Sequence, residues 1–384
     1  MADLPLHDGR VPSWMLRLME RMAGAIARAI VETRGADALL KGLSDPLWFQ
    51  AFNNVIGMDW DSSGSTTVLT GVLKSVTWRS RDLGVLVLGG KGGRMRSIAD
   101  EARVAERLLG VSSEDVVRFS KLAARADSVF LQDGYTLYHH AVIVSNSGRM
   151  IVVQQGMSAE KRLARRYHVD KASLEEPHSG VAGALSPVVL NATATESREA
   201  RRAYADILAE GARRVERMIA EANAILRGQL SLGEYIGERD GSSRRSGLLG
   251  AKPYYYPVEI TPGLRRALED LERFSVSSET ELALAPSLGP RVLRALALVA
   301  DLILGVPTST RDVVTLTLDP YAYSYAVGGK DGVPYPYDRA TAEKVVATLE
   351  EAIELAKLGD REKLRALLKL KRLIERVPHR PPHL

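Results

Sequence analysis

The sequence contains no cysteine, which excludes disulfides, thiolate metal sites and cysteine nucleophiles. It also has no run of about 18 uncharged apolar residues, the length that a bilayer-spanning helix needs. The N-terminal segment MADLPLHDGR lacks the basic start and the apolar stretch of a signal peptide. We therefore expect a cytoplasmic protein with no membrane partner.

The chain carries only a small net charge. Lys and Arg total 52 against 47 Asp and Glu, so the net charge is +5 and the pI is about 9.3. This mild basic excess permits a polyanionic partner but does not require one. Arginine outnumbers lysine, and Asn and Gln are sparse, which is typical both of a thermophile and of a GC-rich genome.

The N-terminal half mixes helical and strand patterns. Apolar residues at helical spacing predict helices over 12–33, 45–56, 65–76, 97–109 and 113–126. Two runs rich in β-forming residues, Thr136–Ser145 and Met150–Gln155, flank a short turn sequence and predict a β-hairpin. Three further segments are predicted as a strand at 84–88, a basic helix at about 158–167 and an irregular stretch at 174–192.

The C-terminal half is helical in pattern. A long helix interrupted by Gly211 is predicted over 194–227, short helices over 259–305, and a final helical pair over 339–377. We therefore predict an α+β protein that is mostly helical, with a small β-hairpin-containing N-terminal domain and an all-helical C-terminal domain. The expected boundaries are 1–190 for the first domain, 191–258 for a long helix and linker, and 259–384 for the second domain.

Residues 279–304 resemble a helix–hairpin–helix, in which a Gly-hydrophobic-Gly turn joins two helices; Ser287 stands where the motif has its first Gly. In that motif the turn amides and the N-terminus of the second helix face a nucleic-acid phosphate. A plain antiparallel helix pair is the alternative. The residues expected to contact DNA backbone here are Leu288, Gly289, Arg291 and Arg294.

A Gly-Val-Pro stretch and then Asp312 follow this segment. Base-excision glycosylases built on the motif are similar in layout, although their second helix is several residues shorter. Bifunctional members also carry a lysine after the second Gly, where this chain has Pro290 and Arg291. Asp312 is thus a candidate catalytic carboxylate, and a helix cap or a salt-bridged surface residue is the alternative.

Long segments resemble an archaeal and bacterial family known as domain of unknown function 763. The resemblance runs nearly end to end and rests on ADLPLHDGRVPSW, LSDPLWFQAF, GMDWDSSGSTT, QDGYTLYHH, VVQQGM, ARRYH, EEPHSG and GGKDGVPYP. It implies no established activity. Members are similar in the helix–hairpin–helix segment, with Gly at the position of Ser287.

Asp59 and Asp61 straddle Trp60 in a turn, and carboxylates so placed can hold Mg²⁺ or Mn²⁺. A capped turn leading into the next helix is the alternative. The hairpin region and the segment after it add acidic and histidine side chains that could complete a metal-dependent nuclease site, or serve only structure. The candidate catalytic set is Asp59, Asp61, Asp133, His139, His140, His168, Glu176 and His178, with Asp59, Asp61 and His140 as metal ligands.

Two Gly/Lys loops, one at Lys91 and one at Lys330, could contact phosphate, although neither matches a P-loop. The leading hypothesis is a DNA-processing protein, namely a metal-dependent nuclease that acts on DNA structure and is positioned by the helix–hairpin–helix. The alternatives are a non-catalytic DNA-binding adaptor and a glycosylase that uses Asp312.

Overall fold

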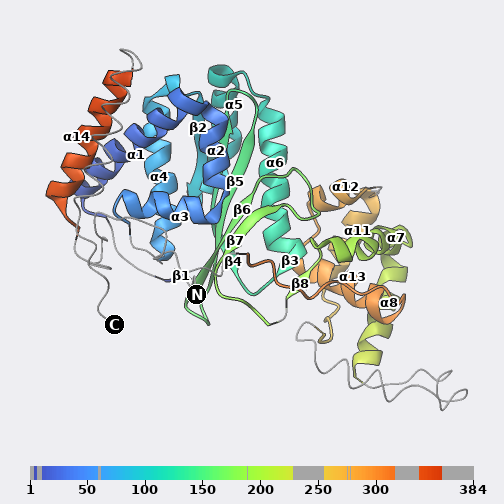
Figure 1. Cartoon of the computed structure of the whole chain (residues 1–384). Coiled ribbons are helices and arrows are strands. Elements are labelled where there is room, and N and C mark those ends of the chain that lie inside the picture. The colour runs from blue at the N-terminus through green and yellow to red at the C-terminus, as the bar shows by residue number, and fades with distance from the viewer. Residues whose placement is uncertain are drawn as a thin grey trace, which may run out of the picture.

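A computed structural model describes residues 4–6, 11–58, 62–187, 189–227, 255–274, 276, 278–315 and 337–356. The chain forms an antiparallel sheet with helices on both faces, and a bundle of helices packs beside it (Figure 1). This arrangement confirms a mixed α+β fold that is mostly helical.

The main sheet has the strand order β1-β6-β5-β4-β2, and β7 pairs with β6. All of these pairings are antiparallel. The strands are β1 (Leu4–Pro5), β2 (Val85–Lys91), β4 (Thr136–Ser145), β5 (Met150–Ser158), β6 (Leu163–Val169) and β7 (His178–Ala182). A separate small sheet pairs β3 (Leu131–Gln132) with β8 (Leu190–Asn191).

The predicted hairpin is confirmed as β4 and β5, but the predicted helix at 158–167 is wrong. Strand β5 continues to Ser158 and β6 begins at Leu163. Arg165, Arg166 and His168 in β6 are at most 1% exposed. These polar side chains are hydrogen-bonded to buried partners, so polar residues lie on both faces of β6. The strand therefore lacks the polar–apolar alternation by which a strand is recognised in a sequence. The expectation of irregular structure at 174–192 is likewise wrong for β7.

Helices cover one face of the sheet with a large apolar core that includes Met19, Phe49, Leu73 and Val153. They are α1 (Ser13–Arg34), α2 (Ala36–Ser44), α3 (Pro46–Val55) and α4 (Ser63–Arg79), with α14 (Arg339–Ala356) packed on α1. Helix α2 was not predicted from the sequence. The opposite face carries α5 (Ile98–Leu109) and α6 (Ser113–Arg125), and α6 leads into a π-helical turn, η3 (Ala126–Phe130).

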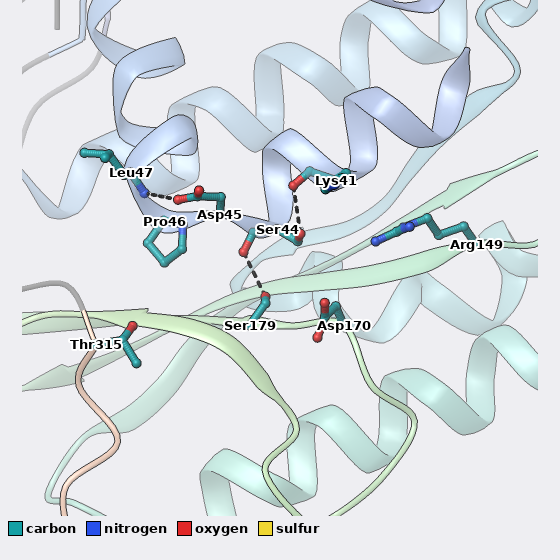
Figure 2. Close-up of a pocket in the computed structure, with 9 residues that line it drawn as sticks. All are labelled: Lys41, Ser44, Asp45, Pro46, Leu47, Arg149, Asp170, Ser179 and Thr315. Carbon is teal, nitrogen blue, oxygen red and sulfur yellow. Dashed lines mark hydrogen bonds between the residues drawn. The ribbon is translucent and has the colours of Figure 1, made fainter. Parts of the chain in front are cut away.

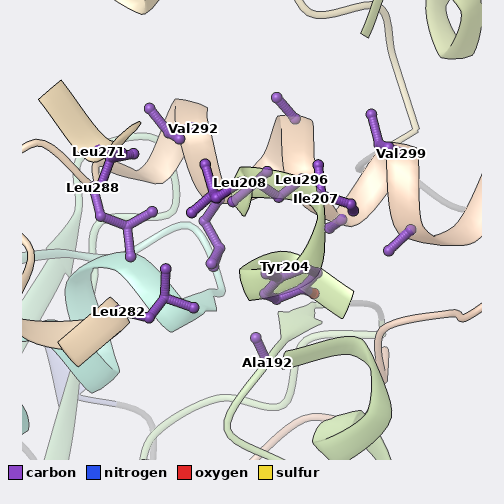
Figure 3. Close-up of a cluster of buried hydrophobic side chains, with 14 of the residues drawn as sticks. Ala192, Tyr204, Ile207, Leu208, Leu271, Leu282, Leu288, Val292, Leu296 and Val299 are labelled. Carbon is purple, nitrogen blue, oxygen red and sulfur yellow. The ribbon is translucent and has the colours of Figure 1, made fainter. Parts of the chain in front are cut away.

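The second helical part contains α7 (Arg198–Ala209), α8 (Ala212–Leu226), α11 (Pro262–Phe274), α12 (Glu279–Leu284) and α13 (Pro290–Leu302). Helix α13 is buried almost along its length; Leu296 and Val299 lie at the centre of this core (Figure 3). The same apolar cluster includes Phe130 of η3 and Leu122 of α6. The helical part therefore shares its core with the elements that flank the sheet.

None of the described helices is both long enough and apolar enough to cross a bilayer.

Candidate functional site

The two hairpin histidines point to opposite faces of the sheet, as alternation along a strand requires. His139 faces α4, with Nε2 3.0 Å from the Thr70 hydroxyl. His140 faces α6, with Nε2 2.9 Å from the Ser120 hydroxyl and Nδ1 2.6 Å from Oε1 of Gln154. The predicted site residues are therefore divided between two separate polar layers.

The first of these, the α4-facing layer, is a row of polar side chains across four strands, β2, β4, β5 and β6. Sheet register places Lys91 opposite His139, His139 opposite Gln155, and Gln155 opposite Arg166. An irregularity in β4 between Leu137 and His139 re-aims the intervening Tyr138. Its hydroxyl accepts a hydrogen bond from Gln155 on the same side of the sheet.

His139 is held as a single tautomer. The Thr70 hydroxyl donates to the carbonyl of Thr66 at 2.8 Å, so Nε2 of His139 must donate to Thr70. Burial, reinforced by repulsion from His140 and Lys91, lowers the pKa of His139 to about 3. The ring is thus neutral at physiological pH, with a bare lone pair on Nδ1 that accepts no hydrogen bond from the described residues.

Gln155 is fully buried beneath the first turn of α4. Its Nε2 donates to the Ser63 carbonyl at 3.0 Å and to the Tyr138 hydroxyl at 2.6 Å, which fixes the orientation of the amide. Its Oε1 accepts no hydrogen bond within the described part of the chain. Two neighbouring cross-strand side chains, Gln155 and His139, therefore each present an unpaired acceptor inside the protein.

Arg166 ends this row and is 1% exposed. Its guanidinium donates to Nε2 of His168 at 3.0 Å and to Oε1 of Gln50 at 3.2 Å, and it stacks 4.5 Å from the ring of Phe49. No carboxylate of the described chain pairs with it, and burial alone lowers its pKa. His168 accepts from Arg166 and donates from Nδ1 to the Leu43 carbonyl, so neither ring nitrogen is open to a ligand.

The second layer, facing α6, is a continuous chain of hydrogen bonds. It runs from His140 through Gln154 to Asp127, which lies in η3. The chain ends at His178, whose Nε2 lies 2.6 Å from Oδ1 of Asp127. Single π-helical turns are frequent at functional sites. This layer joins His140 and His178 of the predicted set but leaves His139 and His168 on the other face.

Asp133 and Asp312 belong to a buried ion-pair network around Arg165. The guanidinium contacts Asp133 at 2.8 Å and both oxygens of Asp312 at 2.9 Å. The Tyr167 hydroxyl also donates to Asp133, and the Ser186 amide donates to Asp312. Burial raises the pKa of Asp133 against the opposing effect of Arg165. This network fastens the segment after α13 to β6.

The remaining predicted catalytic residues are dispersed. Glu176 is partly exposed, pairs with Arg311 at 3.0 Å, and has a left-handed backbone with φ of 45°. Asp59, Asp61 and Lys330 lie outside the described residues. Within the residues that are described, no three His, Asp or Glu side chains form a group able to hold a metal ion.

The first Gly/Lys loop already holds one of the protein's own carboxylates. The Gly89 amide donates to Glu101 at 2.7 Å, and Lys74 pairs with the same carboxylate. Gly89 has φ of 82°, and a Cβ there would lie 2.5 Å from the carbonyl oxygen of His140. Lys91 is exposed and its Nζ lies 5.7 Å from the centre of the Tyr138 ring. Lys91, unlike the buried Gly89, therefore faces solvent at the open end of the α4-facing layer.

The predicted helix pair is present as α12 and α13, joined by residues 285–289. Arg125 at the end of α6 fixes this turn by donating to the carbonyls of Leu288 and Ala285. The Leu288 side chain is buried, and Gly289 caps α13 with an extended backbone rather than a left-handed one. No side chain caps the first turn of α13.

The two arginines of α13 differ in environment. Arg291 is exposed at the first turn, with a single long contact of 3.4 Å to the Thr261 hydroxyl. Arg294 is 8% exposed, donates to the Tyr256 carbonyl and stacks 3.7 Å from the centre of the Tyr256 ring. Only Arg291 therefore extends into solvent beside the helix N-terminus, and Arg294 supports an aromatic ring that is 52% exposed.

A pocket of about 440 Å³ lies elsewhere, between the end of α2, the start of α3 and β7. Ser179 donates to the Ser44 carbonyl across its floor at 2.8 Å, and Lys41, Arg149 and Asp170 line its rim (Figure 2). None of the candidate catalytic or DNA-binding residues lines this pocket, although residues 44–47 and Ser179 belong to the family segments LSDPLWFQAF and EEPHSG.

Gln155, Arg166 and Arg125 were not among the candidate site residues predicted from the sequence. A glutamine in a β-rich run and two arginines in basic segments carry no local signal for burial. The available hint was the hairpin itself, since its second strand places Gln155 opposite His139. Arg166, on the next strand, had no such signal.

No curated protein and no solved structure matches this chain. A family described as "Protein of unknown function (DUF763)" matches residues 1–337 of the 384. That match covers the sheet, both polar layers and the helix pair, so the chain belongs to the DUF763 family.

Proposed function

We propose that this protein is a cytoplasmic DNA-processing protein that holds nucleic-acid backbone at the N-terminus of α13. The observation that carries the proposal is the junction between the turn and α13. Three features meet there: a turn held rigidly by Arg125, a first helical turn without a side-chain cap, and the exposed Arg291. Unpaired amides and the positive end of a helix dipole favour a phosphate, and an adjacent guanidinium adds a charge-assisted contact.

Tyr256 extends the same surface. Its ring lies on Arg294 of the same helix and is half exposed. An aromatic ring beside a phosphate site can stack with an unpaired base. We therefore expect single-stranded or distorted DNA to bind more tightly than an intact duplex.

A metal-dependent nuclease remains our hypothesis for what the protein does to DNA. One observation favours it over a simple adaptor: Gln155 at the first turn of α4 and His139, which contacts Thr70 farther along α4, each have an unpaired acceptor. Helix α4 directly follows the segment that contains Asp59 and Asp61. Exposed Lys91, which makes no ion pair with the described residues, stands at the open end of this layer and would attract a phosphodiester.

The glycosylase alternative fits the geometry less well. A catalytic carboxylate needs an oxygen free to act on the substrate, whereas Arg165 contacts both oxygens of Asp312. These contacts favour a structural role.

The test is fluorescence anisotropy with labelled single-stranded, duplex and branched DNA, with Mn²⁺, Mg²⁺ or chelator present, followed by gel analysis of the same samples. Arg291→Glu should weaken binding to every DNA at least tenfold, because it replaces a phosphate contact with a repulsive charge. Arg103→Glu, a charge change on exposed α5, is the matched control and should bind as the wild type does. Equal affinity of the wild type and Arg291→Glu would remove α13 from the interface.

Metal-dependent cutting would support the nuclease hypothesis. Salt-sensitive binding without cutting in any metal would instead support the adaptor.

A further inference from the structure

We propose that the pocket of about 440 Å³ between α2, α3 and β7 binds a small zwitterion, namely a free α-amino acid with an aliphatic side chain. The inference goes beyond the DNA-binding proposal and does not rest on it. It depends on Lys41, Arg149 and Asp170, three charged residues that line this one pocket. None of the three side chains forms an ion pair with another described residue.

Two cations stand at the rim of the pocket. Lys41 lies in the last turn of α2, Arg149 immediately precedes β5, and both residues are exposed. Within the described ranges, the Lys41 side chain contacts no acceptor, and Arg149 has only a longer-range electrostatic interaction with Asp37. An ammonium and a guanidinium with free donors can bind a carboxylate, and the guanidinium can do so through two parallel hydrogen bonds.

Asp170, directly after β6, supplies the opposite charge at the same pocket (Figure 2). The residue is partly buried, and its Oδ1 is shut off from solvent without a hydrogen bond from any described residue. A carboxylate that loses hydration without gaining a partner destabilises a protein, and an ammonium ligand would restore the missing interaction. The carboxylate torsion is broad, so either oxygen can turn towards a ligand. The other acidic residue of the lining, Asp45, is already engaged, because its Oδ1 accepts from the Leu47 amide at 2.8 Å.

Free groups of both signs in one pocket select a zwitterion over a ligand of one charge. A simple anion would meet the two cations but be repelled by Asp170, and a simple amine would be repelled by Lys41 and Arg149. An α-amino acid carries its ammonium and its carboxylate on one carbon, so a single small ligand satisfies both. Pro46 and Leu47 form an apolar wall on the side away from Arg149 (Figure 2), and this wall suits an aliphatic side chain.

The walls of the pocket are already held in place by hydrogen bonds. The Ser179 hydroxyl donates to the Ser44 carbonyl at 2.8 Å, which ties β7 to the end of α2. The Val181 amide donates to the Thr315 hydroxyl at 2.9 Å, which ties β7 to the segment that follows α13. A pocket formed in advance loses little conformational entropy when a small ligand binds.

The competing explanation is a pocket that holds only water, with Lys41 or Arg149 pairing with Asp170 in solution. Titration calorimetry of the full chain without DNA distinguishes the two, with L-leucine, L-isoleucine and L-valine as probes. At least L-leucine should bind, in the millimolar range or tighter. Isocaproate, which is leucine without its ammonium, and isoamylamine, which is leucine without its carboxylate, should each bind at least tenfold more weakly than leucine.

Variants then assign the binding to this pocket. Asp170→Asn should remove the preference for leucine over isocaproate, because it removes both the partner of the ammonium and the repulsion of a lone carboxylate. Lys41→Met should weaken leucine binding at least tenfold, whereas Lys121→Met, which changes an exposed lysine of α6, is the matched control and should leave it unchanged.

Three results would overturn the proposal: no binding of any of the three amino acids, leucine binding that Asp170→Asn leaves unchanged, or inorganic phosphate that binds more tightly than leucine. The last result would identify a plain anion site. Because no DNA is present, failure of the α13 interface would leave all of these measurements unaffected.

Discussion

At the scale of single residues, the α4-facing layer combines polar groups that the interior does not fully satisfy. Arg166 has no carboxylate partner among the described residues, and His139 and Gln155 each have an unpaired acceptor. Groups of this kind reduce stability, and proteins retain them where binding or catalysis requires them. The opposite layer behaves differently, because Asp127, Gln154 and His140 satisfy one another.

His139 should make the stability of the protein depend on pH. The pKa of His139 in the folded protein, about 3, lies below the ordinary histidine value of 6.5, so the unfolded chain takes up a proton that the folded chain does not bind. Above pH 6.5 this histidine does not change the free energy of unfolding. As pH falls from 6.5 towards 3, the free energy of unfolding decreases. We expect His139→Phe to remove about 1.4 kcal/mol per pH unit of this loss between pH 6 and 4.5. Urea unfolding of both proteins across that range measures the difference, and identical pH slopes would contradict it.

At the scale of elements, the turn between α12 and α13 depends on a residue from α6. Arg125 donates to three of its carbonyls, those of Ala285, Pro286 and Leu288. Arg125→Met should leave these carbonyls without their donor and loosen the turn, so we predict DNA affinity reduced several-fold although Arg125 need not contact DNA. The anisotropy assay measures the DNA affinity, and circular dichroism checks that the variant keeps its helices. Unchanged affinity in a folded variant would mean that the turn needs no such support.

The sequence predicted most elements but not those with buried charge. Helices with a clear apolar stripe, such as α1, α5 and α6, and the hairpin β4–β5 follow directly from periodicity. Strand β6 was predicted as a helix because Arg165 and Arg166 suggested a solvent-facing surface. In the folded protein two of their partners, Asp312 and Gln50, come from segments more than 100 residues away. No local pattern can report such a partner, whereas the placement of His139 and His140 on opposite faces follows from strand alternation alone.

At the scale of the whole molecule, the sheet and the helical part are joined by shared packing and by one buried ion-pair network. Arg165 in β6 contacts Asp312, which follows α13 in the chain. The Thr315 amide also donates to the Val181 carbonyl of β7. The segment that leaves the helix pair is thereby fixed to the sheet, which would hold a DNA-binding surface and the α4-facing layer in constant relation.

Removing one partner of a buried ion pair leaves the other charge uncompensated. Asp312→Ala should therefore lower the free energy of unfolding by about 3–5 kcal/mol. Differential scanning calorimetry should show a clearly lower melting temperature for Asp312→Ala. The control is Glu196→Ala, which removes an exposed partner of Arg311 nearby and should leave the melting temperature almost unchanged. An Asp312→Ala protein that melts like the wild type would restore Asp312 as a catalytic candidate.

The central claim, that the N-terminus of α13 holds nucleic-acid backbone, is tested most directly by the salt dependence of DNA binding. Each phosphate contact that is lost reduces the slope of log affinity against log salt by about 1. We predict strong, salt-dependent binding of single-stranded DNA by the wild type, and a slope smaller by about 1 for Arg291→Gln. No binding, or a slope that Arg291→Gln leaves unchanged, would contradict the claim.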